Sequence, residues 1–390
     1  MAREGMIGFE TGDIRSEMLN SVGTAIVGTG VTFDTGTVRT GTYALKVVAP
    51  SGATGYAPCG STNNFGRIYV RVTVRPATTA RMFFGASGSL HLRINPDGTV
   101  AMYDSSTLIG TSSVALTDTT KWYRIEFRTK SGSSVPVLRI DGVDQVTSSP
   151  SGATFVFQYG ALDTVADTFT IYYDDVAADD TDFPGDGKVV LLVPISQNGT
   201  TAALWVDNDG TQTNMYLGAA NLPPVGVAAA TSPSHKYIKH KGNAAGTTDK
   251  HDADMTTYAS AGLNSGDIVN AVSAWISTGE EVATGTKLIS FEVLSNPVIS
   301  SSGSLDVYPT SGAQGTWPTN WRIQSRILNS APGSPTLGTS PVMRVVRPET
   351  ASRVASVCAM YMYVDYTPAA AKAPPLWINP IYRQMMARSA

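Results

Sequence analysis

The chain has 390 residues, of which 42% are hydrophobic and 15% are charged, and its formal net charge is −3. This length predicts two domains, and the hydrophobic content is enough to build a core in each. A nearly neutral charge excludes the basic field with which proteins hold nucleic acids. The 37 glycines and the low charge favour many strands joined by tight turns over long helices.

The sequence carries no recognisable targeting segment. Its start, MAREGMIGFE, lacks the apolar core of a signal peptide, and no apolar run long enough to cross a membrane occurs further on. We therefore expect a protein that is soluble when it is made. The two cysteines, Cys59 and Cys358, are expected to be free thiols in different domains, so that packing supplies the stability.

Residues 1–180 are predicted to form an antiparallel β-sandwich. Their clearest unit is the segment 121–144, in which Tyr123, Ile125 and Phe127 alternate with charged residues before a Ser/Gly run and a second alternating stretch. A period of two predicts a half-buried strand, and two such strands predict a hairpin with one buried face and one solvated face.

Other segments of this first domain show the same pattern. In residues 67–75, RIYVRVTVR, Ile68 and the valines point one way, whereas the arginines and Tyr69 point the other. Residues 90–102 alternate on both sides of an Asn-Pro-Asp-Gly turn, which predicts a second hairpin. The aromatic-rich stretch 168–176 is predicted to be the closing strand.

Residues 181–366 are predicted to form a second β-sandwich, after a polar Pro/Gly joint at residues 180–187. The segments 267–276 and 287–294 are interpreted as paired central strands, and residues 360–366 as the last strand. The fold class that follows is all-β, with two jelly-roll-like β-sandwich domains and a short C-terminal extension.

Residues 367–390 differ from the rest of the chain and are called the C-terminal arm below. A Pro/Ala-rich linker precedes a small apolar cluster, and no further domain remains to bury that cluster. Trp377, Ile381 and Met385 are predicted to contact a neighbouring subunit. A disordered tail is the alternative interpretation.

Several segments of the first domain, in this order, resemble the concanavalin A-like, or laminin-G-like, jelly roll. The resemblance implies a lectin-like sandwich, although this fold hosts unrelated functions. The segments that carry it are GFETG at residues 8–12, TGTYALKV at 40–47, WYRIEFR at 122–128, LRIDGV at 138–143 and IYYDDVA at 171–177.

The second domain more loosely resembles structural proteins of tailed bacteriophages. The segments concerned are PGDGKVV at residues 184–190, DIVNAVSAW at 267–275 and WPTNWRI at 317–323. In such phages similar units follow a laminin-G-like domain in minor tail or capsid-accessory proteins. The resemblance implies a virion protein that assembles in the host cytoplasm. Its partners would be other virion proteins and copies of itself, and we expect a homotrimer.

Two polar clusters are candidate metal sites. The first is an acidic cluster that could hold Ca²⁺, but its spacing fixes no ligand set, so we expect a solvated strand end. The second is a His-rich stretch, in which nearby lysines oppose cation binding, so we expect a solvated loop. The sequence therefore predicts neither a metal ion nor another cofactor. The residues are Asp174, Asp175, Asp179, Asp180 and Asp182 in the first cluster, and His235, His240 and His251 in the second.

No set of residues is typical of catalysis. Retaining glucanases with this jelly roll, as the resemblance would imply, use an E-x-D-x-x-E strand, and the sequence contains none. Glu126 stands between two arginines, and no G-x-S-x-G motif occurs. We therefore expect a protein that is not an enzyme.

Aromatic side chains on strand faces are the remaining candidates. Tyr69, Trp122 and Tyr172 are predicted to stack on sugar rings, and burial in the core is the alternative for most aromatics of a sandwich. Two functions follow. The first is a structural protein of a tailed-phage virion that acts by assembly and surface adhesion, and the second is a carbohydrate-binding adhesin for host surface glycans. A glycan-cleaving enzyme is the third alternative, and the missing carboxylate pair argues against it.

Overall fold

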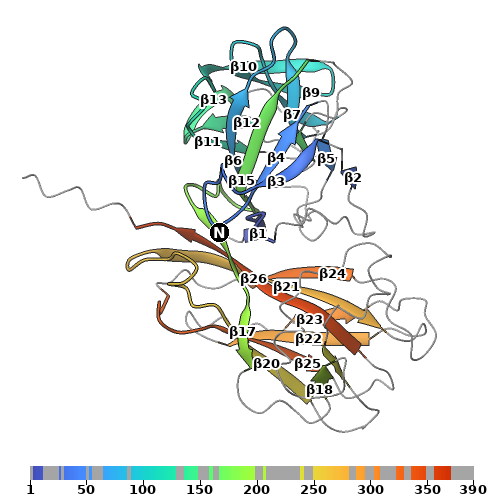
Figure 1. Ribbon diagram of the computed structural model, residues 1–390. Helices are drawn as coiled ribbons and strands as arrows, with labels where there is room; N and C mark the ends of the chain where they lie inside the picture. The colour runs from blue at the N-terminus through green and yellow to red at the C-terminus, as the bar shows by residue number, and fades with distance from the viewer. Residues whose placement is uncertain are drawn as a thin grey trace, which may run out of the picture.

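The described part of the chain consists of β-strands, turns and loops in the computed structural model (Figure 1). No helix occurs among these residues, and so none of them forms a helix that could cross a bilayer. The structure describes residues 3–11, 26–27, 30–49, 52–54, 65–85, 89–128, 136–147, 158–160, 167–197, 205–207, 238–240, 249–280, 287–294, 303–307, 322–328, 335–347 and 355–369.

The first half of the chain forms two antiparallel sheets that pack face to face. The eight-stranded sheet has β6 and β15 at its centre, and the seven-stranded sheet has β7 and β14 in the middle. In spatial order the first sheet contains β13 (Val143–Thr147), β12 (Val137–Ile140), β11 (Tyr123–Arg128), β6 (Phe65–Val74), β15 (Thr170–Asp179), β4 (Ala44–Val48) and β3 (Val31–Asp34), with β1 (Arg3–Ile7) beside β15. The second contains β10 (Thr107–Ala115), β9 (Thr99–Asp104), β8 (Leu90–Ile94), β7 (Arg81–Gly85), β14 (Gln158–Gly160), β5 (Gly52–Thr54) and β2 (Ile26–Val27).

Both hairpins predicted in this half are confirmed. β11 pairs with β12, and β8 pairs with β9 across the Asn-Pro-Asp-Gly turn, where Gly98 has a φ of 90°. The inward residues of these strands, such as Ile125 and Leu92, are fully buried in one core between the two sheets. Alternation along each strand therefore decided the buried face, as it does wherever one face of a sheet packs on a core.

The second half forms two further antiparallel sheets. The six-stranded sheet contains β18 (Trp205–Asp207), β19 (Ile238–His240), β26 (Ala355–Thr367), β21 (Ile268–Glu280) and β24 (Arg322–Leu328), with β16 (Lys188–Leu192) beside β26. The five-stranded sheet contains β17 (Pro194–Gln197), β20 (Asp249–Met255), β25 (Val342–Arg347), β22 (Lys287–Leu294) and β23 (Gly303–Val307).

One predicted pairing in this half is wrong. The segments 267–276 and 287–294 were expected to pair, but β21 lies in the six-stranded sheet between β24 and β26, and β22 lies in the five-stranded sheet. Sequence neighbours often pair, but long strands at the centre of two facing sheets can also lie opposite each other across a core. The two segments are strands, but of different layers.

The two sandwiches meet through apolar side chains. One face of the six-stranded sheet presents Ala271, Trp275 and Tyr363 to the first sandwich, and these residues belong to the same continuous core as Met6 and Phe9. Figure 1 shows β1 next to β21 and β26 at this junction. The apolar contact between the halves is therefore an extension of the first core, not a thin surface contact.

A buried ion pair crosses the same junction. Arg67 on β6 and Asp365 on β26 are both fully buried, and the guanidinium Nη2 lies 2.7 Å from Asp365 Oδ1. Nε of Arg67 also donates to the carbonyl of Asp175, and Asn270 donates to the other oxygen of Asp365. Burial is the largest single effect and by itself would lower the pKa of Arg67, but the attraction of Asp365, together with those of Tyr69 and Asp175, raises it overall. Both charges are thus paired and hydrogen-bonded, as buried charges must be.

The linker between the sandwiches closes over the eight-stranded sheet. Gly185 donates its N–H to Glu126 Oε1 and accepts from Arg67, while the carbonyl of Gly187 accepts from Arg39. Arg67 was expected to point into solvent. That expectation is wrong, because the linker and Asp365 cover the end of the face that alternation alone marks as outward.

Breaking the buried pair is predicted to destabilise the whole chain. Arg67→Met leaves Asp365 buried without its cation and should cost about 3–5 kcal/mol in unfolding free energy, measured by urea denaturation. The exposed pair Lys121–Asp141 provides the control, since Lys121→Met should cost at most about 1 kcal/mol. Equal losses for the two variants would contradict the structural role of the Arg67–Asp365 pair.

Candidate functional site

Two of the three aromatics predicted to bind glycans are buried. Tyr69 is 4% exposed and Tyr172 is 7% exposed, whereas Trp122 is half-buried just before β11. The prediction of exposed stacking faces at Tyr69 and Tyr172 is therefore wrong. Trp122 keeps part of its surface accessible, and its role stays a prediction.

Tyr69 lies under the domain linker. Arg39 stacks on its ring, with the guanidinium carbon 3.4 Å from the ring centroid, and its hydroxyl donates to Asp186 of the linker. Burial raises the pKa of Tyr69 to about 12, so the hydroxyl stays protonated and remains a donor. The ring is consequently part of the junction and offers no face to a sugar.

The seven-stranded sheet carries a different aromatic cluster on the face turned away from the core. Leu90, Leu92 and Ile94 of β8 point into the core, so His91 and Arg93 between them lie on the opposite face, where His91 is fully buried and Arg93 is partly exposed. On the neighbouring strand β9, Tyr103 lies directly opposite His91, and its ring is stacked on the imidazole at 5.3 Å with an interplanar angle of 7°.

Arg93 completes this cluster. Its Nε donates to His91 Nε2 at 3.1 Å, and its guanidinium carbon lies 4.9 Å from the centroid of Tyr103. Leu108 on β10 lies opposite Tyr103 on the other side and is 52% exposed. We call Arg93, His91, Tyr103 and Leu108 the outer-face cluster.

Within the outer-face cluster, the described surroundings of Arg93 leave its charge without a counter-ion. Arg93 forms no ion pair with any carboxylate in the described part of the chain, although it is only partly exposed. With Nε committed to His91, the terminal nitrogens retain their donors, in the planar arrangement that matches a carboxylate or sulfate. The cluster can therefore combine an apolar and aromatic surface with recognition of one anionic group.

The sequence contained a signal for this cluster that was not used. The turn at residues 95–98 fixes the register of the β8–β9 hairpin, and that register puts residue 91 opposite residue 103. Since inward residues were identified by alternation, the outward His91, Arg93 and Tyr103 were available from the same pattern. They were missed because outward residues were treated as solvated surface.

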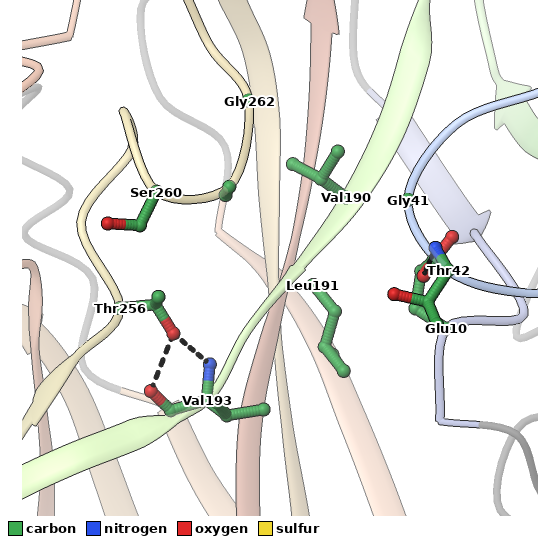
Figure 2. Close-up of a pocket in the computed structure, with 10 residues that line it drawn as sticks. Glu10, Gly41, Thr42, Val190, Leu191, Val193, Thr256, Ser260 and Gly262 are labelled. Atoms are coloured by element: carbon green, nitrogen blue, oxygen red, sulfur yellow. Dashed lines mark hydrogen bonds between the residues drawn. The ribbon is translucent and has the colours of Figure 1, made fainter.

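A cavity of about 510 Å³ lies at the junction of the sandwiches (Figure 2). Its first wall comes from the first sandwich, where Glu10 Oε2 accepts from the N–H of Thr42 at 2.6 Å. Gly41 packs on this carboxylate at a φ of 69°, and a side chain there would overlap Glu10.

The other walls of this junction pocket come from the second sandwich. Val190 and Leu191 of β16 and the following Val193 form the floor, and the loop after β20 supplies Thr256 and Ser260 on the far side. Thr256 bonds both backbone groups of Val193 and so fixes the loop to the end of β16. The pocket thus combines an apolar floor with a single carboxylate and several hydroxyls at its rim.

The acidic cluster is structural in the described part of the chain. Asp174, Asp175 and Asp179 are fully buried, which corrects the expectation of a solvated strand end. Asp174 accepts from the backbone of Arg39 and Thr40, and its pKa is raised well above its ordinary value by burial and by the neighbouring Asp175.

Asp175 ties the first sandwich to the second. Its Oδ1 accepts from the N–H of Val189 at the start of β16, and its Oδ2 accepts from Arg39 and Thr40. The backbone at Asp175 has a φ of 49°, an uncommon conformation for a residue other than glycine. Its position at the junction explains why this strained conformation is maintained. Among the described residues, no group of three or more His, Cys, Asp or Glu is arranged to hold a metal ion.

The His-rich stretch is only partly described. His251 is fully buried on β20, so the expectation of a solvated loop is wrong for this residue. Its burial lowers its pKa to about 4, against a smaller opposing effect of Asp252. His240 lies in β19, and His235 lies outside the described residues, as do Trp377, Ile381 and Met385 of the C-terminal arm.

Comparison with known proteins assigns no family. No protein-family model and no curated protein matches the chain. Among solved structures, the cellulose-induced protein Cip1 is 16% identical, with a TM-score of 0.34 and with 47% of this chain and 99% of Cip1 covered.

Two further structures resemble the chain at similar levels. Domain 4 of AbnA, an extracellular arabinanase from Geobacillus stearothermophilus in complex with arabinotriose, is 14% identical, with a TM-score of 0.33 and with 45% of this chain and 91% of the domain covered. The binding domain of botulinum neurotoxin serotype D is 9% identical, with a TM-score of 0.35 and with 95% of this chain and 98% of the domain covered.

The buried His251 is predicted to make stability depend on pH. The pKa of His251 is about 4 in the folded protein and 6.5 in the unfolded chain, so the unfolded chain binds the proton more strongly. The free energy of unfolding therefore falls as the pH decreases from 6.5 to about 4. At pH 5 this group should cost about 2 kcal/mol relative to pH 7.5. Urea denaturation of wild type and His251→Gln at both pH values measures the difference. Parallel losses in the two proteins would show that His251 is not the responsible group.

Proposed function

We propose that this protein is a carbohydrate-binding adhesin that binds glycans on the outer-face cluster of the first sandwich. The supporting observation is the position of Arg93, which is stacked near Tyr103, bonded to His91 and without a carboxylate partner in the described part of the chain. Arg67 and Arg344 each pair with an acid, whereas Arg93 forms no such pair with a described residue.

The chemistry of the cluster favours an acidic sugar. The exposed Leu108 and the ring of Tyr103 offer an apolar surface to the C–H face of a pyranose, which is how aromatic residues hold sugars. The two terminal nitrogens of Arg93 can donate in parallel to a carboxylate or sulfate on that sugar. A glycan with repeating uronate or sulfated units fits both features.

No enzymatic activity is part of this proposal. Glu126, the one carboxylate at the middle of the first predicted hairpin, is 1% exposed and accepts from Gly185 of the linker. A carboxylate enclosed in this way has no access to a glycosidic bond, and glycoside hydrolysis needs two accessible carboxylates.

The second candidate function is assembly into the particle of a tailed phage, as a minor tail or capsid-accessory subunit. The sequence resemblance of the second sandwich motivates it, and the buried connection between Arg67 and Asp365 favours it, because a subunit that transmits force needs domains in a fixed relation. The two functions are compatible, since adhesion is a common task of a virion surface. Mass spectrometry of purified particles from a host that encodes the protein tests this candidate, and absence of the chain from them would exclude it.

Glycan binding is predicted to depend on Arg93. On an array of neutral and carboxylated or sulfated oligosaccharides, the full chain should bind acidic glycans, and Arg93→Ala should weaken that binding about 10- to 100-fold. Arg93→Lys should restore only part of it, because lysine keeps the charge but loses the planar fork.

Matched controls separate binding from folding. Arg139→Ala removes an arginine from the other sheet, where it pairs with Asp144, and should leave glycan binding unchanged. Tyr103→Ala should weaken binding while the melting temperature of the protein shows whether the sheet persists. Binding of acidic glycans that is equal in wild type and Arg93→Ala, or no binding to any acidic glycan, would contradict the proposal.

A further inference from the structure

We propose that the C-terminal arm of this chain binds in the junction pocket of the same molecule, beside the open edge of β16. This interaction is independent of glycan binding, because the pocket lies at the junction and the outer-face cluster lies on the seven-stranded sheet.

The first argument is the open edge of β16. The N–H of Val189 donates to Asp175 and that of Val193 donates to Thr256, so both point away from the partner strand β26. Because directions alternate with a period of two, the N–H and C=O of Leu191 point the same way, into the pocket. Neither group has a hydrogen-bond partner among the described residues.

A backbone N–H and C=O that both point away from the sheet can bind an extended peptide. A strand added to a sheet edge gains main-chain hydrogen bonds, and pockets beside the edge select its side chains. Leu191 lies in the middle of the pocket floor, between Val190 and Val193 (Figure 2). The pocket therefore offers one main-chain donor, one main-chain acceptor and an apolar floor.

The second argument is the point at which the described chain ends. Ala369 donates its N–H to Asp267 and packs against Gly266, and Gly262 of the same loop lines the pocket. Four residues of this loop span at most about 14 Å, whereas the eight residues from Ala369 to Trp377 can span about 26 Å. The arm can therefore reach the pocket of its own chain.

The covalent connection also favours binding of the arm to its own chain over binding to a second copy. A tethered segment has an effective concentration in the millimolar range, which exceeds the concentration of other copies in solution. We therefore assign the pocket to the arm of the same molecule, and an exchanged arm from a second copy is an outcome of the test.

The third argument is the chemistry of the arm. Leu376, Trp377 and Ile378 are apolar, and they follow Pro374-Pro375, a pair that disfavours a helix. The arm contains Lys372, Arg383 and Arg388 and no Asp or Glu, whereas the charged residue of the pocket is Glu10. Its volume of about 510 Å³ lies in the range of ligand-binding pockets, so a bulky aromatic side chain fits.

Cross-linking of the full chain tests the contact directly. A photoreactive benzoylphenylalanine at position 260, on the pocket wall, should cross-link to residues 370–390 of the same chain. An equal mixture of ¹⁴N- and ¹⁵N-labelled protein distinguishes the sources, since a contact within one chain gives only uniformly labelled products. The same reagent at position 111, on the exposed edge strand β10, should give no cross-link to the arm. Mixed-label products, or none that contain the arm, would overturn the proposal.

Hydrogen exchange provides a second readout. Replacing Leu376, Trp377 and Ile378 by Ser in the full chain should speed exchange of the Leu191 amide about fivefold or more, as expected when one net hydrogen bond is lost. The matched variant with Met385→Ser and Met386→Ser should exchange like wild type. Unchanged exchange at Leu191 in the first variant would contradict pairing of the arm with β16. Glycan binding should be the same in both variants as in wild type, because the pocket and the outer-face cluster are separate.

Discussion

The two sandwiches depend on one buried contact between opposite charges. Arg67 and Asp365 are 298 residues apart in the chain, and both are removed from water at the junction. Each charge would be costly to bury alone, so the position of one sandwich constrains the other. The hydrogen bonds of Asp175 to Arg39 and Val189 act in the same direction, because they tie the first residues of β16 to the first sandwich.

This junction determines which surfaces remain for binding. The linker and the second sandwich cover the outward residues at one end of β6, β11 and β15, including Tyr69 and Glu126. The seven-stranded sheet packs with its other face on the same core, and its outer face carries Arg93 and Tyr103 partly exposed. We therefore propose that the eight-stranded sheet holds the second sandwich and that the seven-stranded sheet binds the glycan.

The strands could be predicted from the sequence, but the segments that cover their outward faces could not. Alternation around Ile68 identified β6, because a period of two depends only on neighbouring residues and on one dry face. The same alternation put Arg67 and Tyr69 in water and failed, since their partners Asp365 and Asp186 are far away in the chain. The outer-face cluster was within reach of the sequence, because a four-residue turn fixes its register. The junction pocket was not, as its walls come from four separate segments.

Differential scanning calorimetry of the full chain tests the central claim most directly. If the buried ion pair and the shared apolar core join the sandwiches into one cooperative unit, the chain should unfold in a single transition whose calorimetric and van't Hoff enthalpies agree. Two resolved transitions, or a calorimetric enthalpy about twice the van't Hoff value, would show that the sandwiches unfold independently and would contradict the account.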